Sequence, residues 1–151
     1  LRIIRELLEF EPQESGTDVG EALRYLTNAI KRRCTAFLIS DLMDFDIDFN
    51  PNWHEALKIA VNRHEISVIS VYDPRERELP DIGLVKLKDS ESGEEMWVDT
   101  SSKRVREYFT SWNSKSATAI NTTLLRYGVD QVQIPTNGDF VKGLVTLFKN
   151  R

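Results

Sequence analysis

Apolar positions recur along this chain with two different spacings, which separate the expected helices from the expected strands. Apolar residues three or four positions apart predict helices over residues 1–10, 18–33, 52–63, 101–128 and 140–149. A short continuous apolar run predicts a strand at about 35–40. Two further strands are predicted at about 66–72, where Asp73-Pro74 stops the strand, and at about 131–134. Because helices alternate with these strands, we expect an α/β fold with a parallel sheet and right-handed crossover connections.

Two local patterns refine this arrangement. Residues 83–99 alternate apolar and polar positions around turn residues 89–93, which predicts an antiparallel β-hairpin outside the parallel sheet. The unbroken apolar run 36–39 is typical of a strand that helices cover on both faces. Capping-box spacing is expected to begin two of the helices, at Asp18 with Glu21 and at Asn52 with Glu55.

Composition narrows the class of protein. The chain has 151 residues, of which 40% are hydrophobic, and this favours a single domain over residues 1–151. A formal net charge of -4 argues against a nucleic-acid partner. The single cysteine, Cys34, fits a reducing, cytoplasmic location, and no apolar run is long enough for this chain to insert into a membrane.

The candidate site lies where two polar signals meet the expected sheet. Residues 15–18 (Ser-Gly-Thr-Asp) precede a helix, and Ser40-Asp41 ends the strand over 35–40. In open α/β sheets, ligands bind beside the carboxyl ends of the strands. We therefore expect hydroxyl and carboxylate groups of Thr17 and Asp41 to converge there, although Thr17-Asp18 is also an ordinary helix start.

A second candidate metal site follows the same strand. Five residues have the relative positions of EF-hand calcium ligands: Asp44, Asp46, Asp48, Asn50 and Glu55. Phe49, however, stands where the calcium loop needs glycine, and a strand rather than a helix precedes the segment. The pattern favours a solvated acidic loop with Phe45, Ile47 and Phe49 turned inward.

Several short motifs together give the chain a family resemblance. Their residue ranges are 15–18, 22–23, 38–41, 63–65, 73–76, 79–83, 89–93 and 98–100. In this order and spacing they resemble the carboxyl-terminal portion of the bacterial domain of unknown function 58 family. That family is similar to von Willebrand factor A domains and is associated with MoxR-type AAA+ ATPases. The resemblance implies an incomplete, Rossmann-like three-layer domain, a fragment of a longer A-type domain that lacks its first strands.

The resemblance also implies part of a metal-ion-dependent adhesion site, with Thr17 and Asp41 as metal ligands. The Asp-x-Ser-x-Ser run of such sites does not occur in this sequence. The nearest match is Asp-Thr-Ser-Ser-Lys at residues 99–103, but it ends in lysine and follows a hairpin strand. The resemblance allows Mg²⁺ or Mn²⁺ in the full-length protein, whereas tight binding of a metal ion to this chain alone is not expected. Residues expected at the partner contact are Ser15, Asp18, Ser40 and Asp44.

Two functions of different classes follow. The first is a non-enzymatic protein-interaction module that acts with a MoxR-type AAA+ ATPase in protein assembly or metal insertion, in the cytoplasm or as the cytoplasmic part of a membrane-anchored protein. The alternative is a small Mg-dependent hydrolase or phosphoryl-transfer enzyme that uses Asp41. The A-domain strand order that the resemblance implies would pair the strand over 35–40 with the missing first strand, so this strand is expected to lie at an open sheet edge. We expect a homo-oligomer through this edge, or its coverage by the helix over residues 1–10.

Overall fold

The computed structural model describes residues 2–10, 16–89 and 93–149. In chain order, the elements are α1 (Arg2–Glu9), α2 (Val19–Ala29), β1 (Thr35–Ser40), α3 (His54–Arg63), β2 (Glu65–Tyr72), the 3-10 helix η1 (Pro74–Glu76), β3 (Leu84–Lys88), β4 (Glu95–Asp99), α4 (Lys103–Arg126), β5 (Asp130–Pro135) and α5 (Phe140–Lys149). These bounds agree closely with the helices and strands that the sequence predicts.

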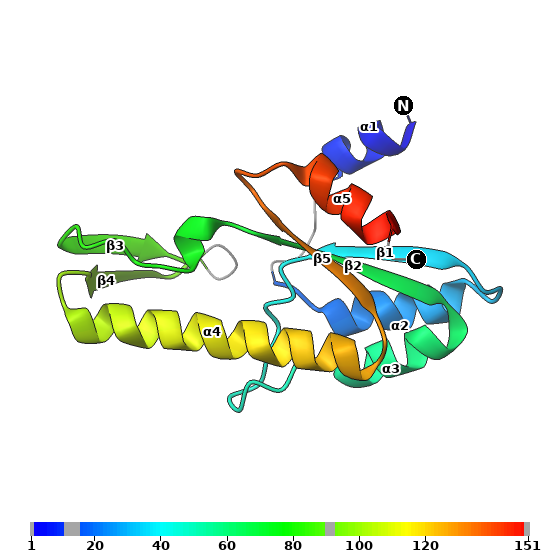
Figure 1. Cartoon of the computed structure of the whole chain (residues 1–151), viewed down its shortest axis with the longest axis horizontal. Coiled ribbons are helices and arrows are strands. Elements are labelled where there is room, and N and C mark those ends of the chain that lie inside the picture. Colours follow the sequence, from blue (N-terminus) through cyan, green and yellow to red (C-terminus); the bar gives the residue numbers. More distant parts are fainter. Residues whose placement is uncertain (1, 11–15, 90–92, 150–151) are drawn as a thin grey trace.

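The three predicted parallel strands form one sheet in the order β1-β2-β5. In the central strand, Ile69 is paired with Ile39 of β1 on one side and with Val132 of β5 on the other. All three strands run the same way, so their carboxyl ends lie at one edge of the sheet (Figure 1). The expected α/β fold is confirmed.

One face of the sheet packs against α2, α3 and α4. Leu57 of α3, Val68 of β2 and Leu124 of α4 are fully buried in the main core, and Trp53 just before α3 is buried with them. Burial of a side chain of this size stabilises the fold by about 1.5–3 kcal/mol. This core fixes where the strands end and where α4 crosses them.

The other face is covered mainly by α5, whose Leu147 packs on Ile69 and Ile134. This helix reaches β1 through an edge-to-face contact between Phe148 and Phe37, with 5.8 Å between ring centroids. Phe37 stays 44% exposed and Ile39 65% exposed. The prediction that helices cover both faces of residues 36–39 is therefore wrong, because α5 is centred over β2 and β5.

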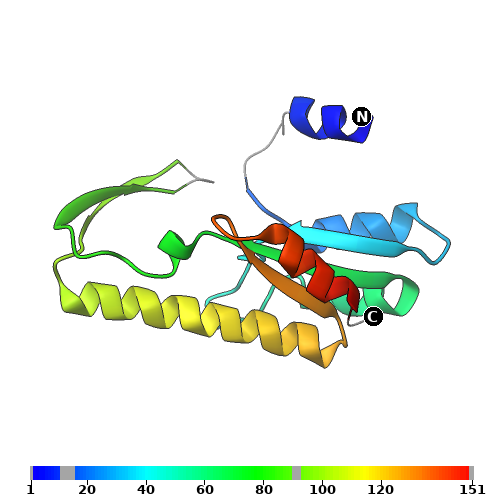
Figure 2. The same cartoon turned by 45° about the horizontal axis from the view of Figure 1, so that its top comes forward.

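Helix α1 does not supply the missing cover. Its apolar residues Ile3, Ile4 and Leu8 are exposed, and Figure 2 shows the helix standing clear of the sheet. Coverage of the β1 edge by the first helix, one of the two expected arrangements, is therefore wrong for this structure. No described strand pairs with the outer edge of β1.

The predicted hairpin is confirmed as a separate two-stranded unit of β3 and β4 beside the start of α4 (Figure 1). The fully buried Thr100 anchors it, because its hydroxyl donates to the Gly83 carbonyl at 2.7 Å and accepts from the Ile82 amide at 3.1 Å. Arg106 of α4 pairs with Asp81 at 3.0 Å. The hairpin is thereby fixed to α4 rather than to the sheet.

Of the two predicted helix caps, the structure confirms the one at Asp18 and not the one at Asn52. Asp18 caps α2, since its carboxylate accepts from the Glu21 amide at 2.6 Å. Asn52 does not cap α3, which begins after Trp53 without a side-chain cap. The Asn52 side-chain amide instead donates to Asp44 at 2.7 Å, across the loop that precedes the helix.

We propose that a second copy of this chain covers the β1 edge. A two-fold axis would pair two β1 strands antiparallel, so that each copy satisfies the main-chain groups of the other and shields Phe37 and Ile39. Ile39→Lys, which places a charge in that contact, is expected to weaken self-association about tenfold or more in sedimentation velocity. Ile82→Lys, at another exposed isoleucine, is the control, and a monomer at all concentrations would contradict the proposal.

Candidate functional site

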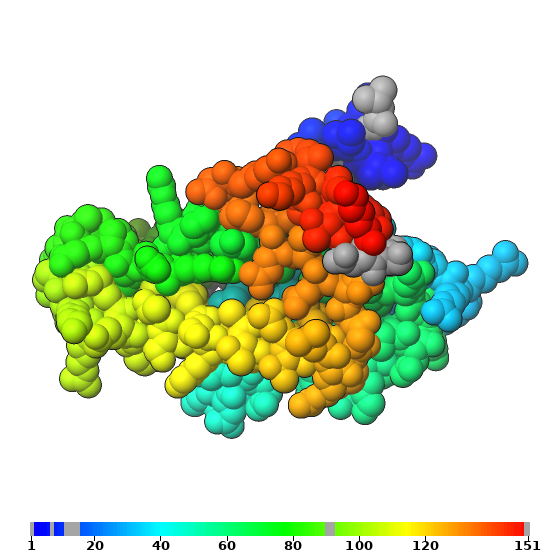
Figure 3. Space-filling view, in the orientation of Figure 1, coloured from blue at the N-terminus to red at the C-terminus, as the bar shows by residue number. Residues whose placement is uncertain are grey.

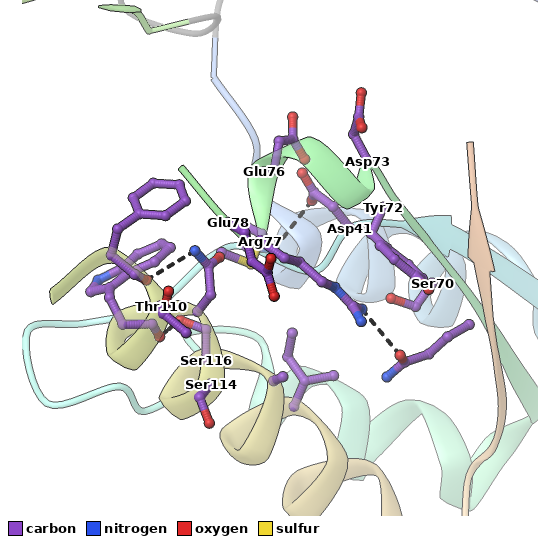
Figure 4. A pocket seen from close by; sticks show the side chains of 17 residues that line it. Asp41, Ser70, Tyr72, Asp73, Glu76, Arg77, Glu78, Thr110, Ser114 and Ser116 are labelled. Atoms are coloured by element: carbon purple, nitrogen blue, oxygen red, sulfur yellow. Dashed lines mark hydrogen bonds between the residues drawn. The ribbon is translucent and has the colours of Figure 1, made fainter. Parts of the chain in front are cut away.

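A cavity of about 460 Å³ lies at the carboxyl edge of the sheet, between the strand ends and α4. Asp41 after β1, Ser70 and Tyr72 of β2, and Gln133 of β5 line its sheet side, and Trp112 lies among the residues that line its α4 side. Figure 4 shows Asp41, Ser70 and Tyr72 on the opposite side of the cavity from the α4 segment that carries Thr110, Ser114 and Ser116. The cavity is thus built from the edge where the sequence predicts a site.

Arg77, just after η1, is the central cation of this cavity (Figure 4). Its guanidinium lies 3.4 Å from the centroid of the Tyr72 ring and donates to Gln133 Oε1 at 3.1 Å. Cation–π stacking and this hydrogen bond hold the side chain in place. Glu76 and Glu78 also line the cavity, yet no ion pair of Arg77 is found among the described residues.

Asp41 is held at the cavity wall by its own turn. Its Oδ1 accepts from the Met43 amide at 3.2 Å and from the Ser40 hydroxyl at 3.4 Å, while the Ser40 hydroxyl accepts from the Leu42 amide at 3.0 Å. Leu42 is fully buried with a φ of 63°. In the described part of the chain, the hydrogen bonds of Asp41 use Oδ1 alone, so Oδ2 can face a ligand.

The other residues of the expected site have different surroundings. Thr17 is exposed before α2 and does not line the cavity, and Asp18 is occupied by its cap and by an ion pair with Arg24 at 3.3 Å. Asp44 accepts from the Asn52 side chain. Ser15 falls outside the described residues. Of the residues expected at the partner contact, Ser40 supports Asp41 directly.

The donors in this chain do not fit a complete Mg²⁺ site. Mg²⁺ favours six oxygen ligands in near-octahedral geometry. Asp41 lines the cavity whereas Thr17 does not, and the described ranges contain no group of three or more His, Cys, Asp or Glu side chains placed to hold a metal ion. Residues 99–103 are part of the hairpin junction, where Asp99 accepts from the Ser101 amide at 3.0 Å. The described residues of this chain therefore do not complete a Mg²⁺ site by themselves.

The acidic loop after β1 uses Asp46 as a turn acceptor. Its carboxylate accepts from the Asp48 amide at 2.9 Å, from the Asn50 amide at 2.8 Å and from the Asn50 side chain at 2.9 Å. These bonds close the loop around Phe49, whose φ is 61°. Ile47 is 95% exposed, so the prediction that it turns inward with Phe45 and Phe49 is wrong.

Three features of the structure lie beyond what the sequence analysis assigned. Arg77 belongs to a stretch of alternating charges that resembles a solvated turn, and Trp112 has the spacing of a core residue. Cys34 and His64 form a pair at the opposite, amino edge of the sheet, with Sγ 3.4 Å from Nδ1. Their contacts involve residues distant in the sequence, such as Gln133 for Arg77 and Phe49 for Trp112, so local spacing alone does not reveal them.

Comparison with known proteins places the chain in a family. The profile described as "Protein of unknown function DUF58" matches residues 1–119. The chain belongs to this family. It is also similar to uncharacterised proteins of Mycobacterium avium and Mycobacterium tuberculosis, with 31% identity over 137 residues to each. It spans 76% of the first protein but 40% of the second, while 89% of the chain is covered in both cases.

A solved structure also resembles this chain. It is the crystal structure of a conserved hypothetical protein, BatB, from Bacteroides thetaiotaomicron. The match covers 99% of this chain and 67% of that one, with 16% sequence identity and a TM-score of 0.49. Within the described part of our structure, no helix has the length and apolar character needed to cross a bilayer.

The hydrogen bonds of Asp46 predict its titration. Donation by the Asn50 side chain, followed by the Asn50 and Asp48 amides, lowers the pKa of Asp46 below its ordinary value. The loop is therefore stabilised above the ordinary aspartate pKa, and this stabilisation is lost as the pH falls through the lowered pKa. NMR titration of the Asp46 carboxyl carbon should give the lowered value, and Asn50→Ala should move it back upward. An unchanged pKa in Asn50→Ala would contradict this assignment.

Proposed function

We propose that this chain is a non-enzymatic protein-interaction module whose contact site is the cavity at the carboxyl edge of the sheet. The observation that carries the proposal is the position of Asp41 on the cavity wall, held through Oδ1 by its own turn. A carboxylate fixed in this way needs little further ordering to meet a partner, which lowers the entropic cost of binding. The lining also includes Trp112, Tyr72 and Arg77, and aromatic residues and arginine are enriched at protein contact sites.

The partner in this proposal is a MoxR-type AAA+ ATPase, as the family resemblance implies, and the process is protein assembly or metal insertion. Thr17 and Asp41 would supply part of a cation site for Mg²⁺ or Mn²⁺, with the remaining ligands from outside this chain. The relatives from M. tuberculosis are much longer than the chain. The activity and the partners of the whole protein are therefore proposals too.

The alternative is a Mg-dependent hydrolase or phosphoryl-transfer enzyme that uses Asp41. Such an enzyme needs a base or nucleophile within hydrogen-bond reach of the reacting group. Besides Asp41, carboxylates and hydroxyls such as Glu76 and Ser70 line the cavity, but no described histidine or cysteine does. Among the described residues, no hydrogen bond joins a lining hydroxyl to a lining carboxylate, so no base and nucleophile are paired there. The lining therefore supports binding better than it supports this chemistry.

Capture of a purified MoxR-type AAA+ ATPase by the 151-residue chain tests the proposal. With Mg²⁺ present, Asp41→Ala is expected to reduce capture about tenfold or more, because it removes the fixed carboxylate at the contact. Asp130→Ala, at an exposed aspartate that starts β5 at the opposite edge, is the matched control. Thr17→Ala, assayed in the same way, tests the second proposed metal ligand.

Equal capture by the Asp41→Ala and Asp130→Ala variants would contradict the proposed contact site. A phosphatase and esterase screen of the same proteins separates the two classes of function. The proposal expects no turnover, whereas turnover that disappears in Asp41→Ala would establish the enzyme in its place.

A further inference from the structure

A groove of about 310 Å³ runs beside the cavity, between α4 and the loop over residues 42–51 that connects β1 to α3. We call it the α4 groove. Its apolar lining consists of Met43, Phe45, Ile47, Phe49, Tyr108 and Trp112. Met43 and Trp112 also line the cavity at the sheet edge, so that the two hollows adjoin. Figure 3 shows the loop projecting beneath α4.

Several apolar side chains that line the α4 groove are exposed to solvent in the single chain. Ile47 is 95% exposed and Tyr108 is 73% exposed, and Met43 and Trp112 are also exposed. A group of exposed apolar side chains beside a hollow is typical of a contact with another molecule. Isolated exposed apolar residues would need no such explanation.

The shape of the α4 groove is already set in the free chain. The Phe49 ring lies 6.1 Å from the Trp112 ring and 6.4 Å from the Phe45 ring, measured between centroids. Phe45 also forms a β-bridge with Pro51, which closes the base of the loop. A preformed groove loses little conformational entropy when a partner binds.

The surroundings of the α4 groove are acidic. Asp46 lines it, Asp44 and Asp48 belong to the same loop, and the adjoining cavity adds Asp41, Glu76 and Glu78. Two cations beside these hollows already face aromatic rings, because Lys115 Nζ lies 5.8 Å from the Phe49 centroid and Arg77 lies over Tyr72. The carboxylates outnumber these cations, which favours a positively charged partner.

We propose that the α4 groove binds a basic amphipathic peptide segment of a protein partner. The apolar side chains of the segment lie between Ile47 and Tyr108, and its Lys or Arg side chains face the acidic loop. This inference rests on the proposed function as an interaction module, and it specifies the chemistry of the partner. The apolar lining supplies contact area, while the carboxylates supply the preference for a basic sequence.

Fluorescence anisotropy with two labelled synthetic helical peptides tests this inference on the 151-residue chain. The peptides share one pattern of leucines and carry either lysine or glutamate at all other positions. The Leu/Lys peptide should bind, and its affinity should fall as salt is raised because part of the attraction is screened. The Leu/Glu peptide should bind at least about tenfold more weakly.

Two variants locate the contact. Ile47→Asp should weaken binding of the Leu/Lys peptide about tenfold by placing a charge in the apolar contact, and Asp48→Lys should weaken it by reversing a loop charge. The controls are Ile82→Asp and Glu6→Lys, which make the same changes at exposed residues elsewhere. Thermal unfolding of each variant checks that the fold is retained.

Equal binding of both peptides, absence of binding, or an unchanged affinity in both groove variants would overturn the inference. The proposed function has its own readout, the capture of the ATPase by wild type and by Asp41→Ala. If capture of the ATPase depends on Asp41 but the peptide measurements contradict the inference, the proposed interaction module is retained and the proposed basic peptide segment is rejected.

Discussion

The packing of the parallel sheet on α2, α3 and α4 determines the rest of this structure. Val68 in the central strand is buried with Leu57 and Leu124, so this core sets both the ends of the strands and the path of α4. Because Asp41 follows β1 and Arg77 follows η1, each side chain is positioned by where its strand leaves the core. The cavity at the carboxyl edge is therefore a consequence of the packing, as in other open α/β sheets.

Most of the fold could be predicted because its signals are local. The apolar run 36–39 forms β1, Asp73-Pro74 ends β2, and the Asp18 cap needs only an amide three residues away. The failures involve partners distant in sequence. Asn52 has the spacing of a cap but bonds to Asp44, and the cover of β1 depends on where α5 lies over the sheet.

The sequence predicted at which edge of the sheet the candidate site lies, but it did not predict which residues line that site. Asp41 ends a predicted strand, so its place at the carboxyl edge followed from the topology. Arg77 and Trp112 carry no such signal, because their role depends on a ring stack with Tyr72 and on the way α4 crosses the strand ends. The resemblance implied Thr17 and Asp41 as a pair of ligands, but it could not show that, of these two residues, only Asp41 lines the cavity.

The cavity and the α4 groove form one surface that combines fixed carboxylates with exposed aromatic side chains. Contact sites commonly join apolar anchors to charges that select the partner. Backbone amide NMR of this chain, with and without the MoxR-type ATPase, tests most directly whether this surface is the site. The account predicts that the shifted or broadened signals cluster at Asp41, Arg77 and Trp112. Changes confined to the opposite edge, near Cys34 and His64, would contradict it.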